Sequence, residues 1–312
     1  NLQIGKGREE WSAGNDIELA LSKNAYPYDY FKLSSDYGRV RVSYFHGFLE
    51  RTEDNVNRFI NARGFEWTNK SSIIIGFSET IIYSGFNRSM DFAYLNPIGS
   101  HLELELNNRL NKPGDFNSNA VWQMHLDIHI KRRSRLSLNF LIDEFVIDPN
   151  IQIGKEHGRA HSIKYSYAIL KKNKNICNIN FSNTYIGTPT FRHGMGTNNF
   201  VNKGIPLGWQ YGSDASSFNI GLSYLKFQKL LIDLSFSFNK SGEEDIRSRP
   251  YEPYKDYIKD TFPSGTISTQ KYLNSSFHWQ KSEYEIYFKS KLIISSNEQT
   301  NYEILLGVSS GF

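Results

Sequence analysis

The chain has 312 residues, of which 39% are hydrophobic and 22% charged, and its formal net charge is +4. It has no run of about 18 apolar residues, which excludes a helical membrane protein. Its Lys and Arg residues are scattered and form no basic helix, so we expect no nucleic-acid partner. Aromatic residues nevertheless reach 15%. A transmembrane β-barrel combines these properties, because only alternate residues of each strand face lipid.

Fourteen strands are predicted in chain order, because apolar and polar residues alternate with period two along them. The predicted strands cover 1–7, 26–34, 38–49, 57–68, 71–83, 119–131, 134–146, 160–171, 175–186, 216–227, 229–239, 267–280, 282–295 and 300–312. In one of them Phe218, Ile220 and Leu222 alternate with Asn219 and Gly221. A soluble β-sandwich also alternates, but its strands are usually shorter, with about five or six residues.

The connections between these strands alternate between tight turns and longer loops. The tight turns lie at 36–38, 68–70, 132–134, 172–174, 228–229 and 281–282. The long loops cover 84–118, 147–159, 187–215 and 240–266, with shorter ones near 51–56 and 296–299. Outer-membrane barrels have short periplasmic turns and longer outside loops, so this pattern favours a barrel over a sandwich.

The last residue of the final predicted strand is Phe312, and a terminal aromatic residue is typical of outer-membrane barrels. It predicts the barrel assembly machinery as a partner. The expected fold class is therefore all-β: a transmembrane, antiparallel, up-and-down β-barrel, integral to a bacterial outer membrane, as a single domain over 1–312. Since the chain opens inside a strand pattern, we expect that a signal peptide and an N-terminal portion with further strands are absent.

Catalytic and metal-binding signals are weak, and we expect no enzyme activity and no cofactor. Gly307–Gly311 matches the G-x-S-x-G motif, but that motif requires a helix after the nucleophile, and the chain ends one residue later. His125, Asp127 and His129 share one strand face, but the two His residues are roughly 13 Å apart by strand rise, too far for one metal ion. We interpret them as part of a polar lumen wall.

Five segments in chain order resemble the capsule assembly protein Wzi family. They are Ile4–Gly14, Leu21–Pro27, Gly76–Thr80, Phe92–Pro97 and Leu141–Phe145. The matches span about residues 1–145. This resemblance implies an outer-membrane barrel of up to eighteen strands in the full chain, with an N-terminal helical part. It also implies a non-enzymatic role, in which the protein holds capsular or exported polysaccharide at the cell surface.

Aromatic, Arg and amide side chains in the predicted outside loops suit an anionic glycan, through stacking and bidentate hydrogen bonds. The candidate glycan contacts are Arg8, Trp11, Arg88, Tyr94, Asn96, Arg159, Arg192, His193, Trp209, Tyr211, Arg247, Arg249, Tyr251 and Tyr254. The alternative for each is an interfacial aromatic girdle or an Arg that pairs with lipopolysaccharide phosphate. Outer-membrane lipid and lipopolysaccharide are therefore further expected partners.

Charged residues within the strands are expected to face the lumen. Arg63 and Glu79 are predicted to form a pair that closes the pore, which is an ordinary arrangement in a barrel interior. Asp143 interrupts the alternation of its strand, and we interpret it as a strand-end residue or a ligand-contacting rim carboxylate.

Three functions remain open from the sequence. The first is attachment or assembly of a surface polysaccharide, which the long aromatic and Arg-rich loops favour. The second is a channel or transporter for sugars or other small solutes, which requires an open lumen. The third is a lipid-modifying enzyme, which requires a Ser/His pair at the outer rim, and the sequence shows no such pairing.

Overall fold

The computed structural model describes most of the chain. The described residues are 1–11, 17–101, 103–104, 118–144, 157–172, 174–227, 229–253, 261–281, 284–296 and 300–310. Among them, no helix is long and apolar enough to cross a membrane.

One antiparallel sheet of fourteen strands forms the body of the protein, and every strand pairs with its neighbours in chain order. Its strands are β1 Leu2–Gly7, β2 Tyr28–Asp36, β3 Val40–Arg51, β4 Val56–Thr68, β5 Ile73–Phe86, β6 Ser118–Ile130, β7 Ser134–Glu144, β8 Gly158–Lys172, β9 Asn175–Ile186, β12 Ala215–Lys226, β13 Leu230–Ser241, β14 Ser268–Lys281, β15 Tyr284–Ser295 and β16 Thr300–Ser310. The predicted fold class is confirmed, and all fourteen predicted strands are present with ends that differ by a few residues.

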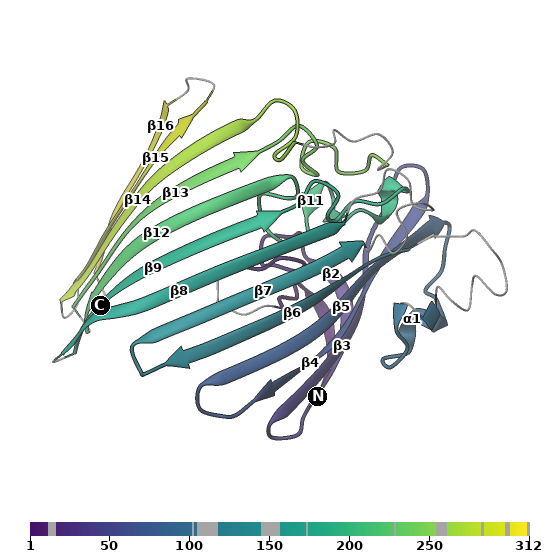
Figure 1. The fold of residues 1–312 in the computed structure, drawn as a ribbon, viewed down its shortest axis with the longest axis horizontal. Helices are drawn as coiled ribbons and strands as arrows, with labels where there is room; N and C mark the ends of the chain where they lie inside the picture. Colours follow the sequence, from purple (N-terminus) through teal and green to yellow (C-terminus); the bar gives the residue numbers. More distant parts are fainter. Residues whose placement is uncertain are drawn as a thin grey trace.

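The sheet is strongly curved, with β1–β5 on one side of the molecule and β13–β16 on the other (Figure 1). Within the described residues no pairing joins β1 to β16. Tight turns join neighbouring strands at one end of the sheet, which we call the turn end, and longer connections lie at the loop end. Gly38, with φ 81°, and Lys174, with φ 63°, supply the left-handed conformation that such short turns need.

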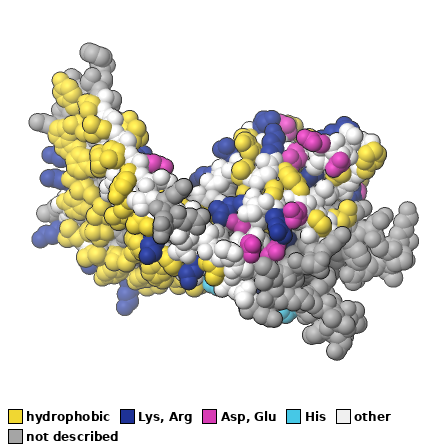
Figure 2. Space-filling model, turned by 90° about the horizontal axis from the view of Figure 1, so that it is seen from above, with side chains coloured by type: hydrophobic (Ala, Val, Ile, Leu, Met, Phe, Trp, Pro, Cys, Tyr) yellow, Lys and Arg dark blue, Asp and Glu magenta, His cyan; other side chains and the backbone are white. Residues whose placement is uncertain are grey.

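One face of the sheet is apolar across most of its width. Directly paired residues in one row of this face are Ile128, Leu136, Tyr165, Phe181, Ile220, Phe236 and Leu273. Figure 2 shows hydrophobic side chains gathered over the part of the molecule where β13–β16 lie. We call this the lipid-facing face, because an outward apolar band is what a membrane barrel presents to the bilayer.

The opposite, inner face is polar over the same strands. The corresponding row reads Asp127, Ser137, Lys164, Ser182, Asn219, Ser237 and Tyr272. Because side chains alternate along a strand, each polar residue here lies next to a lipid-facing neighbour. The apolar residues of the alternating pattern therefore lie on the lipid-facing face, and the polar residues lie on the inner face.

Segments from three connections pack together on the inner face, and we call them the plug. They are residues 17–27 before β2, 187–214 between β9 and β12, and 242–253 after β13. The second segment contains a short 3-10 helix, Gly196–Asn198, and a two-stranded sheet of β10 Val201–Asn202 and β11 Ile205–Pro206. Apolar side chains of all three plug segments form one buried cluster with side chains of the sheet. The plug contributes Leu19, Leu21, Phe200, Leu207 and Ile246, and the sheet contributes Phe45 and Ile60.

A further connection, between β5 and β6, lies on the other face. Its described part at 88–101, which we call the strap, contains the short helix α1 Phe92–Leu95. Asp91 caps α1 by accepting a hydrogen bond from the Ala93 amide, as N-cap residues do. Figure 1 shows α1 outside the curved sheet, beside β3 and β4.

Candidate functional site

The N-terminal segment of the plug is held by the backbone of the 187–214 segment. The Ser22 amide donates to the Leu207 carbonyl at 2.8 Å, and the Trp209 amide donates to the Leu19 carbonyl at 3.1 Å. Between them, a Cβ on Gly208 would stand 1.7 Å from the Leu19 carbonyl oxygen. Glycine is therefore required where the two segments cross.

Amide side chains of the inner face also bind this segment. Gln123 donates through Nε2 to the Trp11 carbonyl at 2.8 Å and accepts from the Ala20 amide at 3.4 Å. Asn139 donates to the Ile17 carbonyl at 3.4 Å. Polar residues on a barrel interior are ordinary, but here they satisfy backbone groups that the plug buries.

Arg58 of β4 is the strongest polar link between the sheet and the plug. Its side chain is fully buried. It donates to the carbonyls of Thr197, Asn199 and Val201 at 2.5, 2.6 and 2.9 Å. It also forms an ion pair with Glu50 of β3. A planar guanidinium with five donors can hold one irregular loop in this way, and a Lys could not.

Glu50 extends this link to the third segment of the plug. Its Oε1 accepts from the Tyr251 hydroxyl at 2.8 Å and from the Lys203 amide at 3.1 Å. The Arg58 guanidinium lies 5.2 Å from the centre of the Tyr251 ring. Two plug segments therefore share one buried ion pair at the loop end of β3 and β4.

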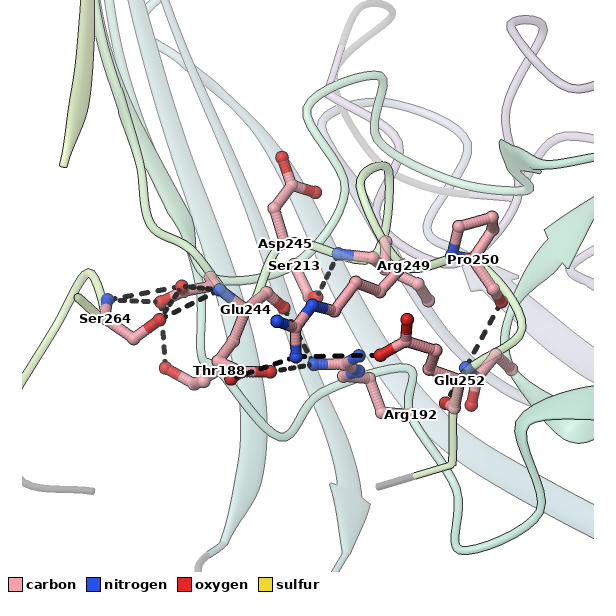
Figure 3. A network of polar contacts seen from close by, with 12 residues as sticks. Thr188, Arg192, Ser213, Glu244, Asp245, Arg249, Pro250, Glu252 and Ser264 are labelled. Atoms are coloured by element: carbon pink, nitrogen blue, oxygen red, sulfur yellow. Dashed lines mark hydrogen bonds and ion pairs between the residues drawn. The ribbon is translucent and has the colours of Figure 1, made fainter. Parts of the chain in front are cut away.

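A second polar network joins the 187–214 and 242–253 segments (Figure 3). Asp214, fully buried with φ 53°, accepts from the Thr188 hydroxyl at 2.9 Å, the Ser264 hydroxyl at 2.5 Å and the Glu244 amide at 3.2 Å. The buried Arg192 donates to the Glu244 carboxylate at 2.8 Å. These contacts pair the buried Arg192 with Glu244 and give Asp214 several donors, while Arg192 Nε has no hydrogen-bond partner among the described residues.

At the edge of this network the ion pairs become exposed. Arg249 lies 3.6 Å from both Glu244 and Glu252, and its side chain is 45% exposed. Figure 3 shows Arg249 and Glu252 on the same side of the network as Pro250. The pair of Arg249 with Glu252 is exposed on both sides, and exposed pairs at this distance contribute little to stability.

A polar cavity of about 500 Å³ lies between the N-terminal segment and the inner face of β2–β4. Its lining consists of Glu9, Glu10, Trp11, Glu18, Lys23, Lys32, Arg41, Ser43 and Glu66. Most of these charges are paired: Lys32 with Glu9 at 2.6 Å and Lys23 with Glu10 at 3.0 Å.

Glu18 is the unusual carboxylate of this cavity. Burial and a hydrogen bond shared with Glu10 raise the pKa of Glu18 to about 7, although its carboxylate accepts from the Lys23 amide at 3.1 Å. The same hydrogen bond lowers the pKa of Glu10. The two carboxylates therefore share a proton that is lost as the pH rises through about 7.

Arg63 and Glu79 form an ion pair at 3.1 Å, but on the lipid-facing face and not in the lumen. Arg58, Ile60 and Ala62 contact the plug, so the alternate residue Arg63 points the other way. The expectation of a lumen pair is wrong about the face. Since a bare ion pair in the membrane-facing surface is costly, something has to cover it.

The strap provides that cover and its backbone partners. The Asn96 carbonyl accepts from Arg63 at 3.1 Å, and the His101 amide donates to Glu79 at 3.1 Å. Trp122 of β6 donates to the same Glu79 oxygen at 2.9 Å. The pair is thereby removed from lipid and hydrogen-bonded on both sides.

Aromatic and polar side chains extend this cluster under the strap. The rings of Tyr83 and Tyr94 stack 4.2 Å apart, and the Arg88 guanidinium lies 4.7 Å from the centre of the Tyr83 ring. The Tyr94 carbonyl accepts from Asn61 at 2.5 Å and from Tyr44 at 3.0 Å. The strap is thus docked through both its backbone and its buried Tyr94.

Several candidate glycan contacts have structural partners instead of open surfaces. Tyr94, Arg192 and Trp209 are buried, and Arg88 lies on the Tyr83 ring. Arg8 donates to the Ala25 carbonyl. These residues lie in the predicted loops, but the burial of Tyr94, Arg192 and Trp209 contradicts the expectation that they are surface contacts, whereas Arg8 remains exposed.

The other candidates are spread over three places. Trp11 lies in the inner cavity against Gly64, where a Cβ would be 2.7 Å from its Cζ2. Asn96 lies in the strap and accepts from the Ile98 amide at 3.0 Å. His193 and Tyr211 are half-buried in the plug.

Of the remaining candidates, Arg159 is an exposed residue at the start of β8. Arg247 pairs with Asp245 at 2.5 Å, and Tyr251 binds Glu50. Tyr254 lies outside the described residues. Asp143 lies on the inner face, where its carboxylate accepts a hydrogen bond from the Phe191 amide of the plug. Asp143 therefore binds the backbone of the 187–214 segment in this structure.

Arg58, Glu50 and Asp214 were not selected by sequence reasoning. Arg58 has the parity of the inner face, and Asp214 lies at the end of a long loop, but no local pattern shows that either is buried. His125 lies 3.1 Å from Glu66, and Asp127 pairs with Arg135 at 2.5 Å. Over the described residues there is no group of three or more metal-ligating side chains. Gly311 of the G-x-S-x-G match lies outside them.

No protein-family model matches the sequence, and no curated protein matches it. The structure is similar to Wzi of Escherichia coli, an outer membrane protein involved in group 1 capsule assembly and described as a carbohydrate-binding β-barrel. That similarity has a TM-score of 0.70 at 10% identity, over 100% of this chain and 67% of Wzi. Pseudomonas aeruginosa OccK10 (OpdN) is similar with a TM-score of 0.50 at 8% identity, over 100% of this chain and 80% of OccK10. The chain therefore has the fold of outer-membrane β-barrels.

Proposed function

We propose that this chain belongs to an outer-membrane barrel that binds an exported, anionic polysaccharide at its outer surface without catalysing a reaction. The observation that carries the proposal is the plug. Buried apolar side chains and the Arg58 hydrogen bonds fix it on the inner face, where an open channel would need water. A filled interior suits a protein that holds a polymer better than one that conducts solutes.

The outer surface of the plug offers groups that suit such a polymer. Tyr26 is 47% exposed, and the Lys203 ammonium lies 5.9 Å from the centre of its ring. Arg249 belongs to the third plug segment, and Tyr251 of that segment donates to Glu50, which also accepts from the Lys203 amide. His193 is joined to the same segment, because Asn199 accepts from its amide and donates to Pro250.

The chemistry of these groups supports an acidic glycan. An exposed tyrosine ring stacks on the apolar face of a sugar, and Arg binds a carboxylate through paired hydrogen bonds. Figure 2 shows most of the visible Asp and Glu side chains, together with Lys and Arg, away from the hydrophobic part of the molecule, while further Lys and Arg side chains border that part. Wzi, which has a similar fold, is described as carbohydrate-binding, and this likeness supports the same class of ligand here.

Binding of hyaluronan oligosaccharides and of dextran to the purified full-length protein tests this proposal. We expect hyaluronan to bind more tightly than dextran, and Tyr26→Ala with Arg249→Ala to weaken hyaluronan binding at least tenfold, equivalent to about 1.4 kcal/mol. The matched control is Tyr37→Ala with Arg132→Ala, a Tyr and an Arg that are exposed at the turn end. Equal loss in both double variants, or no binding by the wild type, would reject the proposal.

A channel is the second candidate, favoured by the inner face of the last strands. A cavity of about 350 Å³ lies there, and its lining includes Asp233, Asn274, Lys289 and Lys291. No described residue of the plug lines this cavity. Single-channel conductance of the full-length protein in a planar bilayer separates the two functions. Steady conductance in the absence of glycan would make the channel the leading function.

A further inference from the structure

The strap has two chemically different sides. Its inward side carries Tyr94 and the carbonyl groups that bind Arg63 and Asn61. Its outward side carries Phe92 and Ile98, which are 86% and 88% exposed. A short surface segment in water would normally show the opposite arrangement.

The surface under the strap belongs to the lipid-facing face of the sheet. Arg63 pairs in register with Tyr44 on one side and with Glu79 on the other, and Glu79 pairs with Trp122. On β4 the same face carries Phe59 and Phe65. The strap therefore packs on the same face as the apolar residues of the neighbouring strands.

An apolar groove of about 1270 Å³ runs between the strap and this face. Its apolar lining includes Leu33, Val42, Phe65, Phe77, Ile98 and Met124. Arg63, Glu79 and Trp122 lie at its polar side, where they are already bonded to one another and to the strap. The groove thus offers mainly apolar walls, which suits a hydrocarbon chain.

We propose that the strap is embedded in the bilayer, with Phe92 and Ile98 in contact with lipid, and that the groove beside it takes a lipid acyl chain. The strap replaces the lipid-facing surface that Arg63 and Glu79 interrupt: it hides the ion pair and presents apolar side chains in its place. The inference rests on the barrel fold and on the register of β3–β6. It does not depend on glycan binding.

Collisional quenching of a fluorescent label tests both parts of the proposal. Single cysteines replace Phe92 on the strap and Met124 in the groove, in a full-length protein in which Cys177 is replaced by Ser. Each is labelled with an environment-sensitive fluorophore and reconstituted into phosphatidylcholine vesicles brominated in the middle of the acyl chains. Iodide is the aqueous quencher.

Two adjacent residues of β14 provide matched references. Phe277 lies on the lipid-facing face and Ser276 on the inner face. We expect the labels at positions 92 and 124 to be quenched by brominated lipid as strongly as the label at 277, and several-fold more than the label at 276. Each variant is first checked for folding by its heat-dependent shift in gel mobility, and position 98 replaces position 92 if that variant does not fold.

Either part of the proposal fails on a clear result. Quenching of the position 92 label by iodide and not by brominated lipid would show that the strap stands in water. A position 124 label that resists brominated lipid, in a protein whose position 277 label is quenched, would show that the groove holds no acyl chain. Glycan binding is unaffected by either outcome, so this test and the previous one fail independently.

Discussion

Arg58 of β4 donates through Nη2 to the carbonyl oxygen of Asn199 at 2.6 Å, across 141 positions of the chain. The contact joins a membrane-spanning strand to the middle of a long connection. Because the guanidinium is fully buried and also binds the carbonyls of Thr197 and Val201, it holds three points of one plug segment at once.

Arg58→Met is expected to lower the free energy of unfolding by about 3–5 kcal/mol, because it leaves Glu50 and three carbonyls buried without their main partner. Urea unfolding in lipid vesicles, followed by tryptophan fluorescence, measures this loss. Arg41→Met is the control, since Arg41 is 60% exposed and its ion pairs of 3.6 and 3.8 Å contribute less than about 1 kcal/mol. Equal unfolding midpoints for Arg58→Met and wild type would contradict the role of Arg58 in holding the plug on the sheet.

Asp214→Asn is expected to loosen the junction between the second and third plug segments. Asn tolerates the left-handed φ of 53°, so the change removes the hydrogen bonds that Oδ2 accepts from the Ser264 hydroxyl and the Glu244 amide without adding backbone strain, while Oδ1 still accepts from Thr188. Trypsin should then cleave faster after Arg247, whose side chain is 35% exposed.

Thr188→Val is the milder comparison for Asp214→Asn, because it removes only one donor to Asp214. We expect its destabilisation to be about 1 kcal/mol, within the range for one hydrogen bond. Cleavage after Arg247 that is no faster in Asp214→Asn than in Thr188→Val would show that Asp214 does not hold the two segments together.

The pKa of Glu18, raised to about 7, predicts a pH dependence of stability. Between the ordinary glutamate pKa of 4.5 and about 7, the folded state binds more protons than the unfolded state, so stability falls as pH rises through this window. Glu18→Gln mimics the protonated form and should remove about 1–3 kcal/mol of that fall. Unfolding midpoints at pH 5 and pH 7.5 measure it, and a wild-type protein equally stable at both would refute the shift.

The strands were predictable because alternation is a local property. Phe218, Ile220 and Leu222 mark their face of β12 without reference to any other segment. The same alternation also predicts the face on which Arg63 lies, and the prediction of a lumen ion pair did not take this into account. Arg63 has the parity of Phe59 and Phe65, so the sequence itself placed it on the apolar face.

The plug and the strap were not predictable in the same way. Whether Arg58 is buried depends on Asn199, and whether Tyr94 is free depends on Asn61 and Tyr83. These are contacts between segments that share no sequence pattern. Composition correctly showed aromatic and Arg-rich connections, but the same residues suit folded loops and glycan surfaces alike.

Arg63 and Glu79 provide the last prediction, through a double-mutant cycle. Glu79→Met alone leaves the Arg63 charge unpaired on the lipid-facing face, and should lower stability by about 3–5 kcal/mol or prevent insertion. In Arg63→Met with Glu79→Met no charge remains, so the double variant should recover most of that loss. Folded fractions in lipid vesicles, from the heat-dependent gel shift, give the comparison. If the double variant is as unstable as the sum of both single variants, the two residues act independently, and the strap is not needed to cover a charge pair.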